Sequence, residues 1–186
     1  MGRIPKLIQY IVRDRLSMLI YGPPGSGKSL LASSVSRLAS GMGLKVCYAY
    51  TASNRPVRGA QAFRFKESVD GLDLARTLLS FSTLGCEFIV VDAINEFYRL
   101  DPSINGAKIL GLASSVLRRI GGYASGVATS RDGVDSTPGL DIMYPFFNII
   151  GSSMKSGENK FVVKVEKPAR KLLVFGPAPE GGVTWM

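Results

Sequence analysis

Residues 22–29 read Gly-Pro-Pro-Gly-Ser-Gly-Lys-Ser and match in full the phosphate-binding pattern G-x-x-x-x-G-K-[ST]. In this pattern the backbone N–H groups of a glycine-rich turn, at the start of a helix, surround a polyphosphate. Lys28 would bring positive charge to the β and γ phosphates, and the Ser29 hydroxyl would bind Mg²⁺. We therefore predict ATP as the ligand and the following nucleotide-binding residues: Gly22, Pro23, Pro24, Gly25, Ser26, Gly27, Lys28, Ser29 and Leu30.

A second residue with a chemical role is Asp92, which ends the apolar run Phe88-Ile-Val-Val-Asp92. A carboxylate at the end of a buried parallel strand, next to a phosphate loop, can orient Mg²⁺ and its waters. Capping of the following turn is the alternative role for such an Asp. We assign Mg²⁺ binding to Ser29 and Asp92 and predict Lys28 and Asp92 as the catalytic residues.

Strands and helices alternate around these motifs, as hydrophobic periodicity predicts them. The order indicates an α/β P-loop NTPase fold in which helices flank a mostly parallel sheet and antiparallel strands follow at the C-terminal end. The predicted strands are 17–21, 44–50, 87–92, 126–129, 147–152, 161–166 and 172–175, and the predicted helices begin near 30, 72 and 107. The second and third of these helices should span residues 72–81 and 107–123. Residues 131–139 should form a loop.

Composition limits the remaining possibilities. A chain of 186 residues with 46% apolar content is long enough for one well-buried domain, so we expect residues 1–186 to form a single ATP-binding core. The absence of histidine argues against zinc and against a histidine general base. Cys47 and Cys86 have no metal or redox spacing, and we expect reduced thiols. No signal peptide or membrane span is visible, so we expect a cytoplasmic protein without a membrane partner.

The net charge of +9 suggests a polyanionic partner, and its distribution sharpens the suggestion. No acidic residue lies between Asp14 and Glu67, where Lys and Arg are frequent. For Arg118 and Arg119, the alternative to nucleic-acid contact is an ordinary solvated helix face. The candidate nucleic-acid contacts are Arg55, Arg58, Arg64, Lys66, Arg118 and Arg119.

Three segments of the chain together resemble the RecA/RadA recombinases. Val90-Val-Asp-Ala-Ile-Asn-Glu-Phe-Tyr-Arg99 is similar to their Walker B segment, and Lys45-Val-Cys-Tyr-Ala-Tyr-Thr-Ala with Arg55-Pro-Val-Arg58 is similar to the strand and loop before it. With residues 22–29, the resemblance is closest to the short archaeal RadA paralogs, RadB-like proteins that consist of the core ATPase domain. It implies an ATP-binding accessory protein of homologous recombination and DNA repair, whose partners are single-stranded DNA and a main recombinase or other P-loop protein.

The chain departs from this family at two positions that matter for chemistry. Where the family has a Glu that orients the attacking water, this chain has Ala52, so we expect weak or absent ATP hydrolysis. Glu67 or Gln61 are possible surrogates. Where the family has a γ-phosphate-sensing Gln, the chain has Arg131, which either contacts phosphate or lies on the surface. The following loop carries Asp132 and Asp135, whose charge opposes a DNA backbone.

Two other function classes remain open from the sequence. One is a non-enzymatic regulatory P-loop subunit of a larger complex, which the missing Glu favours. The other is a nucleotide or small-molecule kinase, which also needs an acceptor-activating carboxylate near the phosphate loop. The acid-free stretch up to Lys66 argues against the kinase.

Overall fold

A computed structural model describes residues 4–131, 134–179 and 181–186, and its main feature is a nine-stranded sheet. The strands are β1 (Ser17–Gly22), β2 (Val46–Tyr50), β3 (Arg64–Glu67), β4 (Phe88–Asp92), β5 (Gly122–Val127), β8 (Ile149–Gly157), β9 (Lys160–Lys167), β10 (Lys171–Pro177) and β11 (Val183–Trp185). A separate two-stranded sheet contains β6 (Thr129–Arg131) and β7 (Val134–Ser136). The helices are α1 (Lys6–Arg13), α2 (Lys28–Gly41), α3 (Gly71–Thr83), α4 (Glu96–Leu100), α5 (Ile104–Ile120) and α6 (Leu140–Met143), with short 3₁₀ turns at Ala52–Asn54 and Tyr144–Phe146.

The strand order of the large sheet is β11-β10-β9-β8-β1-β5-β4-β2-β3. From β8 to β3 all neighbours run parallel, whereas β9, β10 and β11 add antiparallel to one side. The predicted fold class is therefore confirmed, including its antiparallel C-terminal strands. Crossover connections, most of them helical, return the chain between the parallel strands, so their carboxyl ends all meet at one edge of the sheet.

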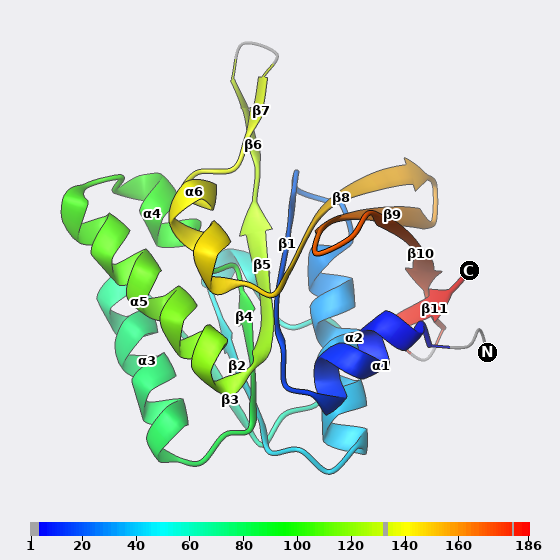
Figure 1. The fold of residues 1–186 in the computed structure, drawn as a ribbon, viewed down its shortest axis with the longest axis horizontal. Helices are drawn as coiled ribbons and strands as arrows, with labels where there is room; N and C mark the ends of the chain where they lie inside the picture. Colours follow the sequence, from blue (N-terminus) through cyan, green and yellow to red (C-terminus); the bar gives the residue numbers. More distant parts are fainter. Residues whose placement is uncertain (1–3, 132–133, 180) are drawn as a thin grey trace.

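Helices cover both faces of the sheet, as Figure 1 shows. On one face α1 and α2 pack over a core that includes Met18, Leu31 and Phe88. On the other face α3 and α5 pack over a second core that includes Leu19, Leu78 and Leu117. Within the described ranges, no helix has the length and apolar character needed to cross a bilayer.

The structure moves the end of the longest helix. We predicted helix over 107–123, but α5 ends at Ile120 and Tyr123 lies within β5. Gly121 stops the helix with a φ of +94°, a conformation that side-chain-bearing residues rarely adopt. Strand β5 therefore starts at Gly122, four residues before the predicted strand at 126–129.

The segment predicted as a loop at 131–139 instead contributes to a β-hairpin. Backbone pairing joins Thr129 to Ser136 and Arg131 to Val134, and Figure 1 shows the hairpin projecting beyond the carboxyl edge of the sheet. Asp132 lies outside the described residues. Two strands were not predicted, β3 at the sheet edge and β11 at the other end, because they are only four and three residues long. Helix α1 was not predicted either.

The expectation of reduced thiols is wrong, because Cys47 and Cys86 form a disulfide. Cys47 lies in the interior of β2, and Cys86 lies just before β4, the strand that pairs with β2. Helix α3 separates the two cysteines by 39 residues along the chain but returns their Cα atoms to 5.9 Å. Sequence spacing alone gave no sign of this pairing, since it depends on the crossover. The cytoplasmic location stays a prediction.

Candidate functional site

The predicted phosphate loop connects β1 to α2 at the carboxyl edge of the parallel strands. Gly22 ends β1 and Lys28 begins α2, so the strand-loop-helix arrangement that the motif requires is present. Gly27 caps the helix in a left-handed conformation with a φ of +85°. This arrangement leaves the first backbone N–H groups of α2 directed at the loop, where they and the helix dipole favour an anion.

Lys28 is buried and its ammonium group closes the loop on itself. The Nζ atom donates to the carbonyl oxygens of Gly22 at 2.9 Å and Pro23 at 2.7 Å, and to the Ser26 hydroxyl at 3.2 Å. Burial lowers the pKa of Lys28 to about 8, although the charge of Asp92 opposes this shift. A polyphosphate would supply the negative charge that these neutral acceptors lack.

Asp92 lies at the end of β4, fully buried on the same face of the sheet as α2. Its Oδ1 accepts a hydrogen bond from the Ser125 hydroxyl, whereas its Oδ2 has no partner among the described residues. Burial raises the pKa of Asp92, opposed by the hydroxyls of Ser125 and Ser29 and by the charge of Lys28. The unpaired buried oxygen, next to a hydroxyl and a phosphate loop, fits a Mg²⁺ ion shared with nucleotide phosphates.

Three residues that the sequence motifs did not indicate hold the phosphate loop in place. The Ser153 hydroxyl of β8 donates to the Ser26 carbonyl at 2.6 Å, and the Tyr123 hydroxyl of β5 donates to the Lys28 carbonyl at 3.0 Å. The Phe161 ring of β9 lies against Gly27. Tyr123 and Ser153 are 95 and 127 positions from their hydrogen-bond partners, and only the sheet order brings them to the loop.

Gly27→Ala is expected to reduce nucleotide affinity at least tenfold. A Cβ atom at position 27 would lie 2.7 Å from the Phe161 ring, and the φ of +85° is unfavourable for Ala. The loop would have to shift away from the geometry that surrounds phosphate. Titration with a fluorescent ATP analogue measures the effect.

Gly41→Ala is the matched control for that variant. Gly41 also lies in α2, and nothing lies within 4 Å of a Cβ atom built there. It should bind nucleotide like wild type and unfold at a slightly higher temperature. Equal affinities for both variants would contradict the proposed role of the loop.

Position 52, where the resemblance implies a water-orienting Glu, lies beside the predicted metal ligand. The Thr51 amide donates to the Asp92 carbonyl at 3.0 Å, so the chain leaves β2 next to the end of β4. Ala52 follows at the exposed start of a 3₁₀ turn. A carboxylate at this point would lie beside the end of β4 and Asp92, and Ala52 supplies none.

The two predicted surrogates differ in their position. Glu67 ends β3 in register with Tyr50 of β2, so one strand separates it from Asp92. Its backbone is therefore roughly 10 Å from Asp92, and it lies on the same edge of the sheet. The backbone N–H of Gln61 donates a hydrogen bond to the Ser36 hydroxyl, and Ser36 is about 12 Å along α2 from Lys28. Of the two, Glu67 is the better surrogate.

The predicted phosphate contact Arg131 lies at the outer end of β6, where its backbone pairs with Val134. The base of this hairpin is tied to the Walker B segment by Asn95, three residues after Asp92. The Asn95 side chain accepts from the Val127 amide at 2.8 Å and donates to the carbonyls of Val127 and Pro138 at 3.0 and 3.1 Å. The sequence motifs do not single out this buried Asn, although it is a polar residue just after Asp92.

Helix α4 carries an ion pair to which the sequence motifs assign no role. Arg99 pairs with Glu96 at 3.0 Å, and its Nε atom is buried without a partner among the described residues. Besides burial, the charge of Arg99 lowers the pKa of Lys28. Helix α4 thus places a carboxylate and a guanidinium four and seven residues after Asp92.

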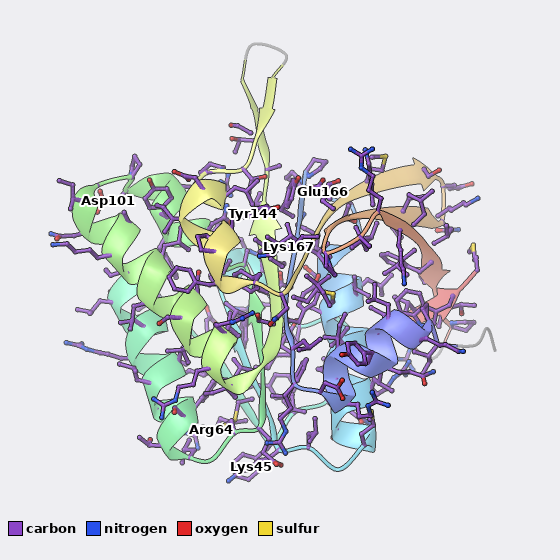
Figure 2. All side chains as sticks on the ribbon, in the orientation of Figure 1. Lys45, Arg64, Asp101, Tyr144, Glu166 and Lys167 are labelled. Atoms are coloured by element: carbon purple, nitrogen blue, oxygen red, sulfur yellow. A yellow bond between two sulfur atoms is a disulfide. The ribbon has the colours of Figure 1, made fainter. Side chains whose placement is uncertain are left out.

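The candidate nucleic-acid contacts are not brought together in one surface. Arg55 and Arg58 lie in the segment beside α2, where the Val57 carbonyl accepts from Ser33. Arg64 and Lys66 lie on β3, and Figure 2 shows Arg64 at the edge of the molecule opposite the projecting hairpin. Arg118 and Arg119 occupy the last turn of α5, away from the phosphate loop.

Comparison with known proteins supports the fold. No protein family model and no curated protein matches this sequence. Among solved structures 411 chains match, so the fold alone does not decide the function. One of them is the flagellar accessory protein FlaH from Methanocaldococcus jannaschii, with a TM-score of 0.64 and 14% sequence identity over 92% of this chain and 89% of that chain. The chain therefore has a RecA-like P-loop fold.

Proposed function

We propose that this chain binds ATP with Mg²⁺ and acts as an accessory protein that hydrolyses the nucleotide slowly or not at all. The observation that carries the proposal is a buried Asp92, with one unpaired oxygen, beside a complete phosphate loop and next to Ala52. Binding needs the loop, Lys28, Ser29 and Asp92, whereas fast hydrolysis also needs a group that orients the attacking water. This combination favours a nucleotide-dependent switch over a motor.

The setting we favour is homologous recombination and DNA repair, as a RadA/RadB-like paralog. The support is the sequence resemblance and the net charge of +9. Single-stranded DNA would bind through its phosphates without sequence preference, and the protein partner would be a main recombinase or another P-loop protein.

A second candidate is a regulatory P-loop subunit without DNA affinity of its own. The scattered positions of the predicted DNA contacts favour it, and so does the description of FlaH as a flagellar accessory protein. A kinase is the least favoured class, because no acidic residue lies between Asp14 and Glu67.

Asp92→Asn is expected to remove most of the Mg²⁺ dependence of ATP binding. A neutral amide keeps the shape of the side chain but loses the charge that holds the ion. Titration of a fluorescent ATP analogue, with Mg²⁺ and with EDTA, should show at least tenfold tighter binding with Mg²⁺ for wild type and a ratio near one for the variant. Absence of ATP binding by wild type would refute the proposed function.

Salt-titrated binding to single-stranded DNA separates the two settings. For the recombination setting, affinity should fall steeply as salt rises and should not depend on sequence. Wild-type protein that binds Mg-ATP but no DNA at low salt would leave the regulatory subunit as the function.

A further inference from the structure

An apolar groove of about 420 Å³ opens between the first turns of α3 and α5, with α4 along one side. Its floor comes from the second core, including Leu74, Ile94 and Leu110. It lies on the opposite face of the sheet from α2, and therefore it is distinct from the phosphate loop. Figure 2 shows Asp101, one of its rim residues, at the outer end of the helical layer.

Large apolar side chains at the rim of this groove are exposed. Val69 is 76% exposed, Leu72 49% and Leu100 78%. They come from three different elements and surround one hollow, so they are not single surface residues of the kind that every protein has. Clusters of this sort, bordered by polar residues, mark surfaces that bind another molecule.

The border of the groove is acidic in a protein that is otherwise strongly basic. Asp70 and Asp101 line it, and among the described residues no Lys or Arg does. Both aspartates cap local turns, Asp70 by accepting from the Asp73 amide and Asp101 by accepting from the Ser103 amide. The caps neutralise neither carboxylate, so the border keeps a negative charge within a chain of net charge +9. Charge complementarity therefore selects an apolar segment with basic flanks.

Helix α4 joins the groove to the nucleotide site. Phe97, Tyr98 and Leu100 line the groove, while Glu96 and Arg99 of the same five-residue helix form an ion pair. Because α4 starts four residues after Asp92, a change in the pairing of Arg99 on phosphate binding would move the groove-lining side chains as well. The Arg99 Nε atom is buried without a partner among the described residues, so the pairing of this guanidinium can change.

We propose that this groove binds a basic amphipathic helix of a partner protein, and that nucleotide at the phosphate loop changes its affinity through α4. Apolar anchors spaced along one helix face would enter the hollow, and Lys or Arg beside them would pair with Asp70 and Asp101. The coupling rests on the proposed nucleotide binding, whereas the groove itself does not.

The probe for this proposal is a fluorescein-labelled peptide with the sequence Leu-Lys-Lys-Leu-Leu-Lys-Leu repeated twice. Fluorescence anisotropy should detect its binding, and a peptide with Glu in place of Lys should bind at least tenfold more weakly. Leu72→Asp should weaken binding of the basic peptide at least tenfold. Leu79→Asp is the matched control, since Leu79 is 46% exposed, lies two turns further along α3 and does not line the groove. It should bind like wild type.

The same titration with saturating Mg-ATP tests the coupling. The expected change in peptide affinity is fivefold or more, and Arg99→Gln should bring that ratio toward one. Equal losses of peptide affinity in Leu72→Asp and Leu79→Asp, or equal affinities for the basic and the acidic peptide, would overturn the proposal that the groove is the binding site. Self-association that Leu72→Asp abolishes, with no peptide binding, would assign the surface to a second copy instead and also overturn the proposal. A peptide affinity that Mg-ATP does not alter overturns the coupling if a fluorescent ATP analogue binds, and refutes the proposed function if it does not.

Discussion

Ala52→Glu should increase the rate of ATP hydrolysis by at least a hundredfold. Ala52 follows the end of β2, where the Thr51 backbone amide donates a hydrogen bond to the Asp92 carbonyl. The Ala52 side chain is exposed. A glutamate there can accept a proton from, or orient, a water molecule that attacks the γ phosphate. General-base catalysis of this kind contributes about 10²–10⁴ to a rate. Steady-state phosphate release, with saturating Mg-ATP, measures the change.

Ala52→Gln is the matched control, because it has the same length without the carboxylate. It should leave hydrolysis near the low wild-type rate, and both variants should keep wild-type affinity for Mg-ATP. Fast hydrolysis by the wild type that Glu67→Ala abolishes would transfer the water-orienting role to Glu67, and the argument from Ala52 would then be wrong.

Removal of the disulfide between Cys47 and Cys86 should cost about 4 kcal/mol of unfolding free energy, because the bond closes a loop with a sequence separation of 39 residues. The loop contains β3 and α3, so the reduced unfolded chain gains the freedom of a whole crossover unit. A loss of this size corresponds to a decrease of roughly 8–16 °C in the midpoint of thermal unfolding. Urea denaturation with and without reductant measures the free energy directly.

The double variant Cys47→Ala, Cys86→Ala controls for effects of the reductant itself. It should unfold at lower urea than oxidised wild type, and reductant should not change its midpoint. Alkylation of both cysteines in native wild-type protein, without prior reduction, would show that the bond is absent.

The conformation of the candidate nucleotide site was predictable where its signal is local in sequence. The loop from Gly22 to Ser29 and the strand that ends in Asp92 each contain their own signal, because glycine spacing and an apolar run dictate their conformation. What the sequence could not indicate are the contacts that depend on strand register. Ser125 reaches Asp92 only because β4 and β5 are neighbours, and no spacing along the chain encodes that neighbourhood.

Tyr123 illustrates why one boundary was misplaced. Its apolar ring continues the helical spacing of Ile109, Leu112, Val116 and Ile120, so periodicity alone extends the helix through it. The left-handed Gly121 and the following Gly122 break that pattern. A Cβ atom at Gly122 would collide with the backbone of Ile89, so close strand packing rather than helix propensity decides the position.

The bonds that hold the phosphate loop also affect how the protein is made. The Ser153 hydroxyl that holds the Ser26 carbonyl is synthesised 127 residues after the loop. At about 5–20 residues per second, translation takes roughly 6–25 s to cover that interval. During this time the nascent chain carries a phosphate-binding motif without β8 and β9 to shape it. Under the proposed function, high-affinity nucleotide binding would therefore begin only after β8 and β9 have been synthesised, and ATP would selectively stabilise chains that contain both strands.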